Sequence, residues 1–394
     1  MKNKFISKRY WKNNSTPMGQ VDELAKNFDD VINLSLGDPD LITHNIIIDN
    51  AFKDARQGHT KYTDFRGDPE LRCEIAKFYK EEYALDVHDK EIFVTTSGCL
   101  AMYLVLEAIL DDGDEVILQA PYFTPYYQQV ELARGIPVEL STYEEDDFQI
   151  SFDKLEKLIN ERTKAIIINS PCNPTGNILS RQTLESIRDI AVKYDLIIIS
   201  DDIYTSFSFN EPFIPIASIE GMKERTIIIN SFSKNFTMTG WRIGNIIAPG
   251  YIINVIQQIN ENLVFTSPSI SQRGAIHALR NRKEIQPEII KEYKDRVFYA
   301  ADRINRIPNM SIISPKGTFY LFVNIKKTGL SSIEASDAIL KEAHVLTIPG
   351  IAFGDCGEGY LRLACTVGVE KLKEAFDRIE KMDIFKIKGE HHEQ

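Results

Sequence analysis

Thr226-Ile-Ile-Ile-Asn-Ser-Phe-Ser-Lys-Asn-Phe-Thr-Met-Thr-Gly-Trp-Arg-Ile-Gly244 is the stretch that decides the fold. It begins with an apolar run, Ile227–Ile229, that is too short for a helix, and it then breaks into small and polar residues. This pattern is typical of a buried parallel strand that delivers a loop to the edge of a sheet. Lys234 follows the strand, with Ser231 before it and Arg242 after it. An amine between two potential anion-binding side chains fits a lysine that forms a Schiff base beside a phosphate.

A rival interpretation of the same lysine is a serine acyl-enzyme. Ser231-Phe-Ser-Lys234 matches the S-x-x-K signature of that class, and Lys327-Thr-Gly329 matches its K-T-G signature. However, Ser151-Phe-Asp-Lys154 also matches S-x-x-K, so the pattern has little specificity. No S-D-N lies between the two matches, and a buried strand is the wrong context for that serine. We therefore set the acyl-enzyme interpretation aside.

Composition and charge are those of an ordinary globular protein. The chain has 394 residues, enough for two domains or for one large domain with an appendage. Hydrophobic residues make up 43% of it and charged residues 26%. The net charge is −11, and no basic block is long enough to follow a phosphate backbone, so nucleic acid is not expected as a partner.

The cysteines and the N-terminus favour a cytoplasmic protein. Five cysteines, an odd number, form no C-x-x-C pair and no metal-like spacing, so we expect reduced thiols and no metal site. The N-terminal residues contain no apolar core of signal-peptide length, and no apolar run approaches the length of a membrane span. We expect no membrane association.

Apolar runs alternate with helical patterns through the middle of the chain. We expect strands at 92–96, 115–118, 164–169, 196–199, 226–231 and 243–247, with helices at 100–110 and from Ser180. This alternation predicts an α/β fold with three layers, in which helices cover both faces of a mostly parallel sheet. No G-x-G-x-x-G follows the first strand, so a dinucleotide is not favoured.

The strand–helix alternation does not continue through the last part of the chain. Residues 251–306 have a largely helical pattern, with a long stretch from Pro287 that could bridge two domains, and a mixed α+β pattern follows it. We therefore predict an N-terminal arm with part of a small domain at 1–40, a large domain at 41–285 and a small domain at 286–394.

Polar side chains follow the strands of the predicted sheet at the points where these strands end. They are Ser97, Tyr122, Asn173, Asp201 and Lys234. In an open α/β sheet, ligands bind at this edge. The sequence therefore predicts one binding site formed by these side chains.

These residues resemble those of the class I and II aminotransferases, pyridoxal phosphate (PLP) enzymes of the aspartate aminotransferase type with fold type I. The likeness extends from Gly37 to Arg362. Its motifs are Lys61-Tyr62 with Gly67, Ser97-Gly98, Asn173-Pro-Thr-Gly176, Asp201 with Tyr204, Ser231-x-x-Lys234 with Gly240-Trp-Arg-Ile-Gly244, and Arg362. Each motif alone has little specificity, but their shared order and spacing are specific.

The resemblance implies a role for each side chain around the cofactor ring. Lys234 would hold pyridoxal 5′-phosphate as an aldimine and would move a proton at the substrate. Asp201 would pair with the ring nitrogen, and Tyr204 and Asn173 would donate to the phenolic oxygen of the ring. Phe123 would stack on the ring.

The resemblance also assigns residues to the phosphate and to the substrate. The phosphate would be held by Ser97, Gly98, Cys99, Ser231 and Arg242, and by Tyr62 from the other subunit of a homodimer. The substrate carboxylate would be bound by Arg362 in a two-pronged pair, with Gly37 and Asn173 beside it.

The implied function is transfer of an amino group from an L-amino acid to a 2-oxo acid by a ping-pong mechanism, within amino acid metabolism. A PLP-dependent carbon–sulfur β-lyase is the alternative, because its cofactor pocket would look almost the same. A PLP-binding protein without catalysis is the third interpretation.

Two features of the sequence bear on the substrate. Some bacterial aspartate-specific relatives carry a lysine at the position of Cys99, and its absence here weakens a dicarboxylate preference. Four aromatic residues could line a pocket for an aromatic or aliphatic side chain, namely Tyr122, Phe319, Tyr320 and Phe353. Asp202 stands where the family usually has Glu, and we assign it no role.

Overall fold

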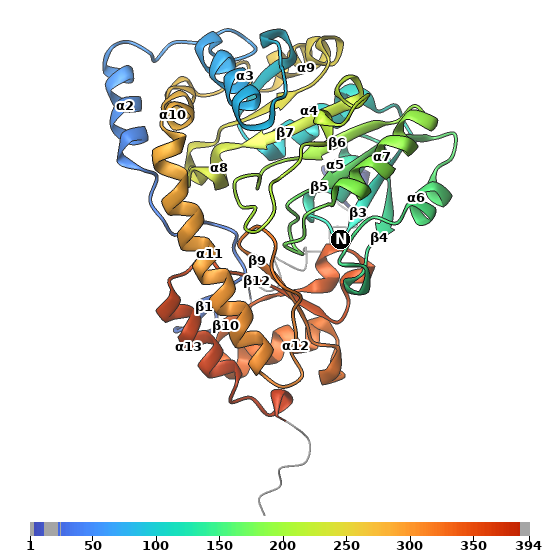
Figure 1. The fold of residues 1–394 in the computed structure, drawn as a ribbon, viewed down its shortest axis with the longest axis vertical. Helices are drawn as coiled ribbons and strands as arrows, with labels where there is room; N and C mark the ends of the chain where they lie inside the picture. Colours follow the sequence, from blue (N-terminus) through green and yellow to red (C-terminus); the bar gives the residue numbers. More distant parts are fainter. Residues whose placement is uncertain (1–3, 12–22, 24, 387–394) are drawn as a thin grey trace, which may run out of the picture.

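A seven-stranded sheet forms the centre of the protein in the computed structural model, which describes residues 4–11, 23 and 25–386 (Figure 1). Its strands, in spatial order, are β2 (Ile92–Thr95), β8 (Gly244–Ile247), β7 (Thr226–Ser231), β6 (Ile197–Asp201), β5 (Thr163–Asn169), β3 (Glu115–Ala120) and β4 (Ile136–Ser141). β8 runs antiparallel to both of its neighbours, and the other pairs are parallel. The predicted α/β fold with a mostly parallel sheet is confirmed.

The isoleucine run in β7 is buried on both faces of this sheet. Ile227 and Ile229 pack in one hydrophobic cluster, whereas Ile228 between them packs in another. Alternate side chains of a strand point to opposite faces, so a continuous apolar run requires cover on both sides. Helices provide this cover and make three layers, with α4 (Gly98–Ile109), α5 (Pro125–Leu132) and α9 (Gly250–Leu263) in one cluster and α6 (Phe152–Leu158) and α7 (Arg181–Lys193) in another.

Three further helices pack beside the sheet: α2 (Asn45–Arg56), α3 (Pro69–Tyr83) and α10 (Ser269–Arg280). α3 has a capped start, because the Asp68 side chain accepts a hydrogen bond from the Glu70 amide and Pro69 is the first helical residue. Arg273 of α10 pairs with Asp54 of α2 at 2.7 Å. These contacts tie the chain before the sheet to the helices that follow it.

The C-terminal part forms a smaller body with its own sheet. Strands β11 (Ile348–Pro349), β12 (Tyr360–Ala364) and β9 (Tyr320–Asn324) pair antiparallel, and α12 (Ser332–Ala338) and α13 (Val369–Ile379) pack around them. α11 (Arg282–Arg306) extends from the helices beside the large sheet down along this smaller body (Figure 1).

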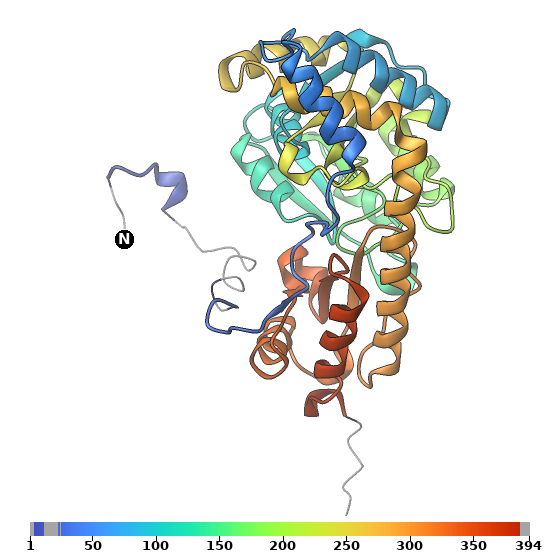
Figure 2. The same ribbon diagram turned by 90° about the vertical axis from the view of Figure 1, so that its left-hand side faces the viewer.

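The N-terminal strand joins this C-terminal body. β1 (Ile32–Asn33) pairs in parallel with β10 (Val345–Leu346), so the chain just before Gly37 lies beside a strand of the C-terminal body. Residues 4–11 lie away from the rest of the protein in Figure 2, and residues 1–3, 12–22 and 24 of the predicted arm fall outside the described residues. The domain boundaries at 41 and 286 stay predictions. Among the described residues, no helix has both the length and the apolar character that crossing a membrane requires.

Candidate functional site

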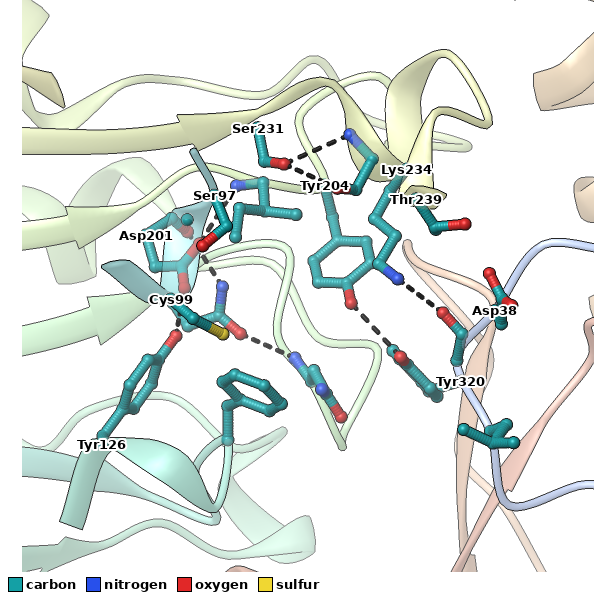
Figure 3. Close-up of a pocket in the computed structure, with 18 of the residues that line it drawn as sticks. Asp38, Ser97, Cys99, Tyr126, Asp201, Tyr204, Ser231, Lys234, Thr239 and Tyr320 are labelled. Atoms are coloured by element: carbon teal, nitrogen blue, oxygen red, sulfur yellow. Dashed lines mark hydrogen bonds between the residues drawn. The ribbon is translucent and has the colours of Figure 1, made fainter. Parts of the chain in front are cut away.

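A cavity of about 470 Å³ opens at the carboxyl ends of the parallel strands, between the large sheet and the smaller body (Figure 3). Ligands of open α/β sheets bind at this edge. Every residue that the resemblance assigns to the site, except Tyr62, lines the cavity: Gly37, Ser97, Gly98, Cys99, Phe123, Asn173, Asp201, Tyr204, Ser231, Lys234, Arg242 and Arg362. Of the five strand-end residues, Tyr122 alone does not line it. The structure therefore brings together side chains that are far apart in the sequence.

Lys234 points its amine across the cavity. It lies on α8 (Phe232–Asn235), the short helix that directly follows β7, and its Nζ donates a hydrogen bond to the carbonyl oxygen of Gly37 at 2.6 Å (Figure 3). The pKa of Lys234 is lowered to about 8, chiefly by burial; Asp38 opposes this lowering, and the cations of Arg242 and Arg362 contribute to it. A lysine with a lowered pKa is a nucleophile and a base near neutral pH.

Asp201 occupies the other side of the cavity, at the last position of β6. It is buried, the Tyr126 hydroxyl donates a hydrogen bond to its Oδ2, and the amide of Ile203 donates to its Oδ1 at 3.2 Å. Burial raises the pKa of Asp201 to about 6, although the Tyr126 hydrogen bond lowers it. A cationic partner would stabilise the charged form of a buried carboxyl whose pKa is raised in this way.

Tyr204 lies between these two groups and contacts the smaller body. Its hydroxyl donates a hydrogen bond to the Tyr320 hydroxyl at 3.2 Å. Tyr320 in turn packs against Gly37, where a Cβ atom would stand 1.6 Å from the Tyr320 Oη. Only glycine fits at position 37, because any side chain there would displace the tyrosine.

Arg362 is a buried guanidinium that keeps one nitrogen free. It lies on β12, its Nη1 donates to Asn173 Oδ1 at 3.2 Å, and its Nη2 donates to the carbonyl oxygen of Ser35. The rings of Tyr320 and Phe353 lie 4.6 and 4.9 Å from its Cζ. Nε is buried and has no hydrogen-bond partner within the described chain. An unpartnered donor on a buried cation suits a carboxylate ligand.

The opposite end of the cavity offers donors for an anion. Ser97 caps α4 and its Oγ accepts a hydrogen bond from the Leu100 amide at 3.0 Å. Ser231 Oγ lies 2.9 Å from Ser233 Oγ, to which it donates. Arg242 is exposed on this side, and its Nη1 donates to the Thr239 carbonyl oxygen at 2.7 Å. A helix N-terminus, hydroxyl groups and a guanidinium together form a site for a phosphate.

Two glycines allow this end of the cavity to close tightly. A Cβ at Gly244 would lie 2.8 Å from the Asn230 carbonyl oxygen and 3.0 Å from the Gly98 amide. A Cβ at Gly98 would lie 2.8 Å from Cδ1 of Ile203. The strand β8 therefore approaches the start of α4 closely because neither backbone carries a side chain there.

Tyr62, which the resemblance assigns to the phosphate, lies outside the cavity. It is 81% exposed, and its ring contacts Phe265 at 4.9 Å between centroids. Its predicted role concerns the site of another subunit, so that role stays a prediction. Phe123 lines the cavity and makes an edge contact with Tyr126 at 5.6 Å between ring centroids.

Of the four aromatic residues expected at a substrate pocket, only Tyr320 lines this cavity. Phe319 is fully buried in the core, and Phe353 packs against the guanidinium of Arg362 from outside. Tyr122 donates a hydrogen bond to Glu139 at 2.6 Å instead. Tyr320 thus lies where it was expected, whereas Tyr122, Phe319 and Phe353 do not line the cavity. Aromatic rings near a site also support its polar groups, as Phe353 does for Arg362.

Sequence reasoning missed several lining residues, among them Ser35, Asp38, Tyr126 and Asn169. Asn169 ends β5, and its side chain donates to the Asp201 carbonyl oxygen at 2.8 Å and accepts from the Asn173 amide at 2.7 Å. Its place at a strand end could have revealed it. Tyr126 lies inside α5, where no sequence pattern separates a carboxylate partner from a core tyrosine.

Comparison with known proteins relates this chain to one family. The sequence profile of the family described as aminotransferase class I and II matches residues 29–379. An aspartate aminotransferase of Pyrococcus abyssi is 42% identical over 373 residues, which cover 94% of this chain and 96% of that protein. Aromatic-amino-acid aminotransferase 2 of Thermococcus litoralis is 39% identical over 94% of this chain and 96% of its own length.

Solved structures of aminotransferases are also similar to this protein. A crystal structure of an aromatic aminotransferase from Pyrococcus horikoshii has a TM-score of 0.87 at 40% identity and covers 91% of this chain and 97% of that one. An aspartate aminotransferase from Thermus thermophilus with maleate has a TM-score of 0.90 at 29% identity, covering 96% and 99%.

Proposed function

The chain belongs to the class I and II aminotransferases and is an aminotransferase, and we propose that its cavity binds pyridoxal 5′-phosphate for this reaction. The reaction would move an amino group from an L-amino acid to a 2-oxo acid in two half-reactions. The observation that carries the proposal is the amine of Lys234, directed into a cavity that also holds the buried Asp201 and Arg362.

The residues at the phosphate end fit the cofactor. The N-terminus of α4 at Gly98 and Cys99, the hydroxyls of Ser97 and Ser231, and the guanidinium of Arg242 would hold the phosphate. Gly98 and Gly244 keep the floor of this end free of side chains. A doubly charged anion needs several donors of this kind at once, and each of them lines the same cavity.

The residues around the middle of the cavity fit the ring. The bound cofactor would supply a protonated pyridine ring that withdraws electrons from the substrate Cα, and an aldehyde that takes up the amino group. Asp201 would keep the ring nitrogen protonated, and the Tyr126 hydrogen bond would hold that carboxylate in place. Tyr204 and Asn173 would donate hydrogen bonds to the phenolic oxygen, and Phe123 would lie against the ring face.

Lys234 would perform the proton transfer. Its lowered pKa, about 8, leaves roughly a quarter of the amine neutral at pH 7.5, so it can accept a proton from the substrate Cα. The Gly37 carbonyl oxygen at 2.6 Å directs the amine toward the side of the cavity where Arg362 lies. Arg362 would bind the α-carboxylate through Nε and Nη2, which orients the Cα–H bond toward the lysine.

A second copy of the chain would complete the phosphate end. Tyr62 is exposed on the surface, next to Phe265 and Phe65. We propose that this loop packs on another copy and that Tyr62 reaches its phosphate site, which makes the protein a homodimer with shared sites. Sedimentation of wild type and Tyr62→Phe, with measurement of cofactor affinity, tests this; a monomer of full activity would contradict it.

Reduced thiols support a cytoplasmic location. The structure pairs none of the five cysteines with another, and Cys73 and Cys99 are exposed. Exposed free thiols persist in a reducing compartment. Recovery of the protein in the cytoplasmic fraction of its own cells would support this proposal.

The deciding experiment mixes the holoenzyme with a panel of L-amino acids and follows the cofactor spectrum and the products. Release of the matching 2-oxo acid, with the amino group retained on the cofactor, supports transamination. Release of pyruvate and ammonia from cystathionine or cysteine, without transamination of any donor, would contradict it.

A further inference from the structure

The ring of Phe148 comes from the side of the large sheet but is buried in the smaller body. Phe148 lies in the connection between β4, the edge strand of the large sheet, and α6. Among the described residues, the other buried members of its hydrophobic cluster belong to the smaller body: Phe322, Ile348, Ala352, Phe353 and Tyr360. The centroid of its ring lies 6.1 Å from those of Phe322 and Tyr360. This side chain therefore inserts from one body into the other.

Phe148 packs on the face of the small sheet that carries Arg362. Residues directly opposite each other on antiparallel strands point to the same face. Arg362 is opposite Phe322 of β9 and opposite Ile348 of β11, and both of these belong to the Phe148 cluster. Phe353, another member, lies against the guanidinium at 4.9 Å from Cζ. The neighbours of Arg362 on its own sheet are therefore the residues that Phe148 packs against.

The backbone of Phe148 is held by the turn that carries Asn173. Asn177 Nδ2 donates a hydrogen bond to the Phe148 carbonyl oxygen at 3.3 Å, and the Asn177 carbonyl oxygen accepts from the Cys172 amide at 2.8 Å. Asn173 Oδ1 accepts from Arg362 Nη1 at 3.2 Å. One turn of the large-sheet side thus contacts the guanidinium directly and also holds the residue that packs on its strands.

Phe148 adopts a backbone conformation that is unfavourable for an aromatic residue. Its φ is 50°, and Asp147 before it has a φ of 57°. Such a conformation persists only where the surrounding contacts impose it. The same loop makes two polar contacts with the smaller body, because Asp147 pairs with Lys316 and Glu144 Oε2 accepts from the Tyr360 hydroxyl at 3.1 Å. Contact with the smaller body therefore outweighs the local preference of the chain.

We infer that Phe148 is a positioning residue for Arg362. The inference rests on the proposed function, in which Arg362 binds the substrate α-carboxylate, and Phe148 itself does not line the cavity. A close-packed ring between β4 and the small sheet prevents that sheet from shifting, so the guanidinium keeps one position relative to Lys234. A smaller side chain leaves a void into which the sheet relaxes, and the two-pronged pair with the carboxylate is then misaligned.

The test combines two variants of the contact with a matched control. Phe148→Leu removes part of the ring, and Glu144→Gln removes the charge to which Tyr360 and Asn324 donate. Phe152→Leu is the same change as the first at the start of α6, where the ring is 39% exposed and outside the cluster. The measurements are KM and kcat for an amino donor, cofactor affinity, and the affinity of the holoenzyme for butyrate, a carboxylate without an amine.

In Phe148→Leu we expect KM and the Kd of butyrate to rise about tenfold, with kcat within about threefold and cofactor affinity within about twofold of wild type. Glu144→Gln should change KM and Kd in the same direction by about threefold. Phe152→Leu should leave all four quantities unchanged. When either contact variant is added to Arg362→Lys, KM should rise by less than about twofold, because the group being positioned is already gone.

Values of KM and butyrate affinity within twofold of wild type in both contact variants would overturn the inference. So would an undiminished rise in KM on the Arg362→Lys background, because a general loss of structure gives that result. Should Phe148→Leu fail to fold, Glu144→Gln decides by the same two measurements. If no amino acid released a 2-oxo acid while butyrate binding still weakened as expected, the proposed function would fail and the positioning of Arg362 by Phe148 would stand.

Discussion

Lys234 and Gly37 are 197 positions apart in the sequence, and a hydrogen bond of 2.6 Å joins the amine of one to the carbonyl oxygen of the other. The lysine comes from the end of a strand in the large sheet, and the glycine comes from the segment that follows β1 in the smaller body. This contact links the two bodies at the amine of Lys234. The position of the lysine therefore depends on how both of them are placed.

Replacing Lys234 by alanine should abolish transamination. The amine that would hold the cofactor and move the proton is then missing, so we expect kcat to fall by at least about a thousandfold. Borohydride treatment of the wild-type holoenzyme, followed by peptide mapping, should find the label on residue 234. A label on another lysine, or full turnover in the alanine variant, would contradict the assignment.

Asp201 and Asp202 are adjacent buried acids with different expected roles, and their asparagine variants form a matched pair. Asp201→Asn would remove the anion that we propose for the ring nitrogen, so we expect kcat to fall about a hundredfold or more. Asp202 is fully buried, accepts a hydrogen bond from Ser200 at 2.6 Å, and does not line the cavity. We expect Asp202→Asn to stay within about fivefold of wild type in kcat. Equal losses in both variants would argue against the specific role of Asp201.

Asp201 should also make the stability of the cofactor-free protein depend on pH. Its folded pKa of about 6 lies above the ordinary value of 3.8, so in this window the folded protein binds more protons than the unfolded chain. The free energy of unfolding should therefore fall as pH rises from about 4 to about 6, by up to about 3 kcal/mol from this group. Urea unfolding at several pH values should show a smaller fall in Asp201→Asn. Burial raises the pKa of Asp202 as well, so Asp202 contributes to the pH dependence in both proteins. The difference between the two pH slopes therefore reports the contribution of Asp201. The same pH slope in both proteins would contradict this expectation.

Replacing Arg362 by lysine should weaken substrate binding more than cofactor binding. Lysine keeps the charge but cannot make a two-pronged pair with a carboxylate. The variant also loses the donors to Asn173 and Ser35. We expect kcat/KM to fall about a hundredfold, with cofactor affinity within about threefold of wild type. Unchanged KM values for every donor would show that another group binds the α-carboxylate.

Glycine substitutions should separate close packing at the phosphate end from a general effect of added methyl groups. In Gly244→Ala the new Cβ would stand 2.8 Å from the Asn230 carbonyl oxygen of β7 and 3.0 Å from the Gly98 amide, so β8 must move away from β7 and from the start of α4. We expect a loss of about 1–3 kcal/mol in stability and weaker phosphate binding. Gly368→Ala, where no atom lies within 4 Å, is the control and should be nearly neutral in thermal unfolding. Equal melting temperatures for the two variants would contradict the packing argument.

The parallel sheet was predictable because its central strands are uninterrupted isoleucine runs. β5, β6 and β7 each carry such a run, and neighbours on both sides of the sheet bury it. The edge strand β4 was missed. It is half-exposed, and Pro137 at its second position weakens the strand pattern.

Other boundaries were wrong for local reasons. α11 begins at Arg282 rather than at Pro287, because the proline is accommodated inside the helix. Within the mixed α+β pattern, the apolar residues 345–349 are divided into β10 and β11, which pair with different partners. The helix before them is α12 followed by a π-helical turn, Ile339–Ala343.

The residues of the site were also predictable only in part. Lys234, Asp201 and Asn173 follow strand ends or motifs, and the sequence places them together. Asp38 and Tyr126 carry no such signal. Their place in the cavity results from the packing of distant segments, and Asp38 in particular depends on the hydrogen bonds that Arg362 and Lys234 make to its neighbours.

Arg362 lies on β12, in the last part of the chain, while its carbonyl partner Ser35 lies near the first. Almost the entire polypeptide therefore has to be synthesised before the contact between Arg362 and Ser35 can form. On the proposed function, a chain that ends before residue 362 would keep Lys234 but lack the guanidinium that we assign to the substrate carboxylate.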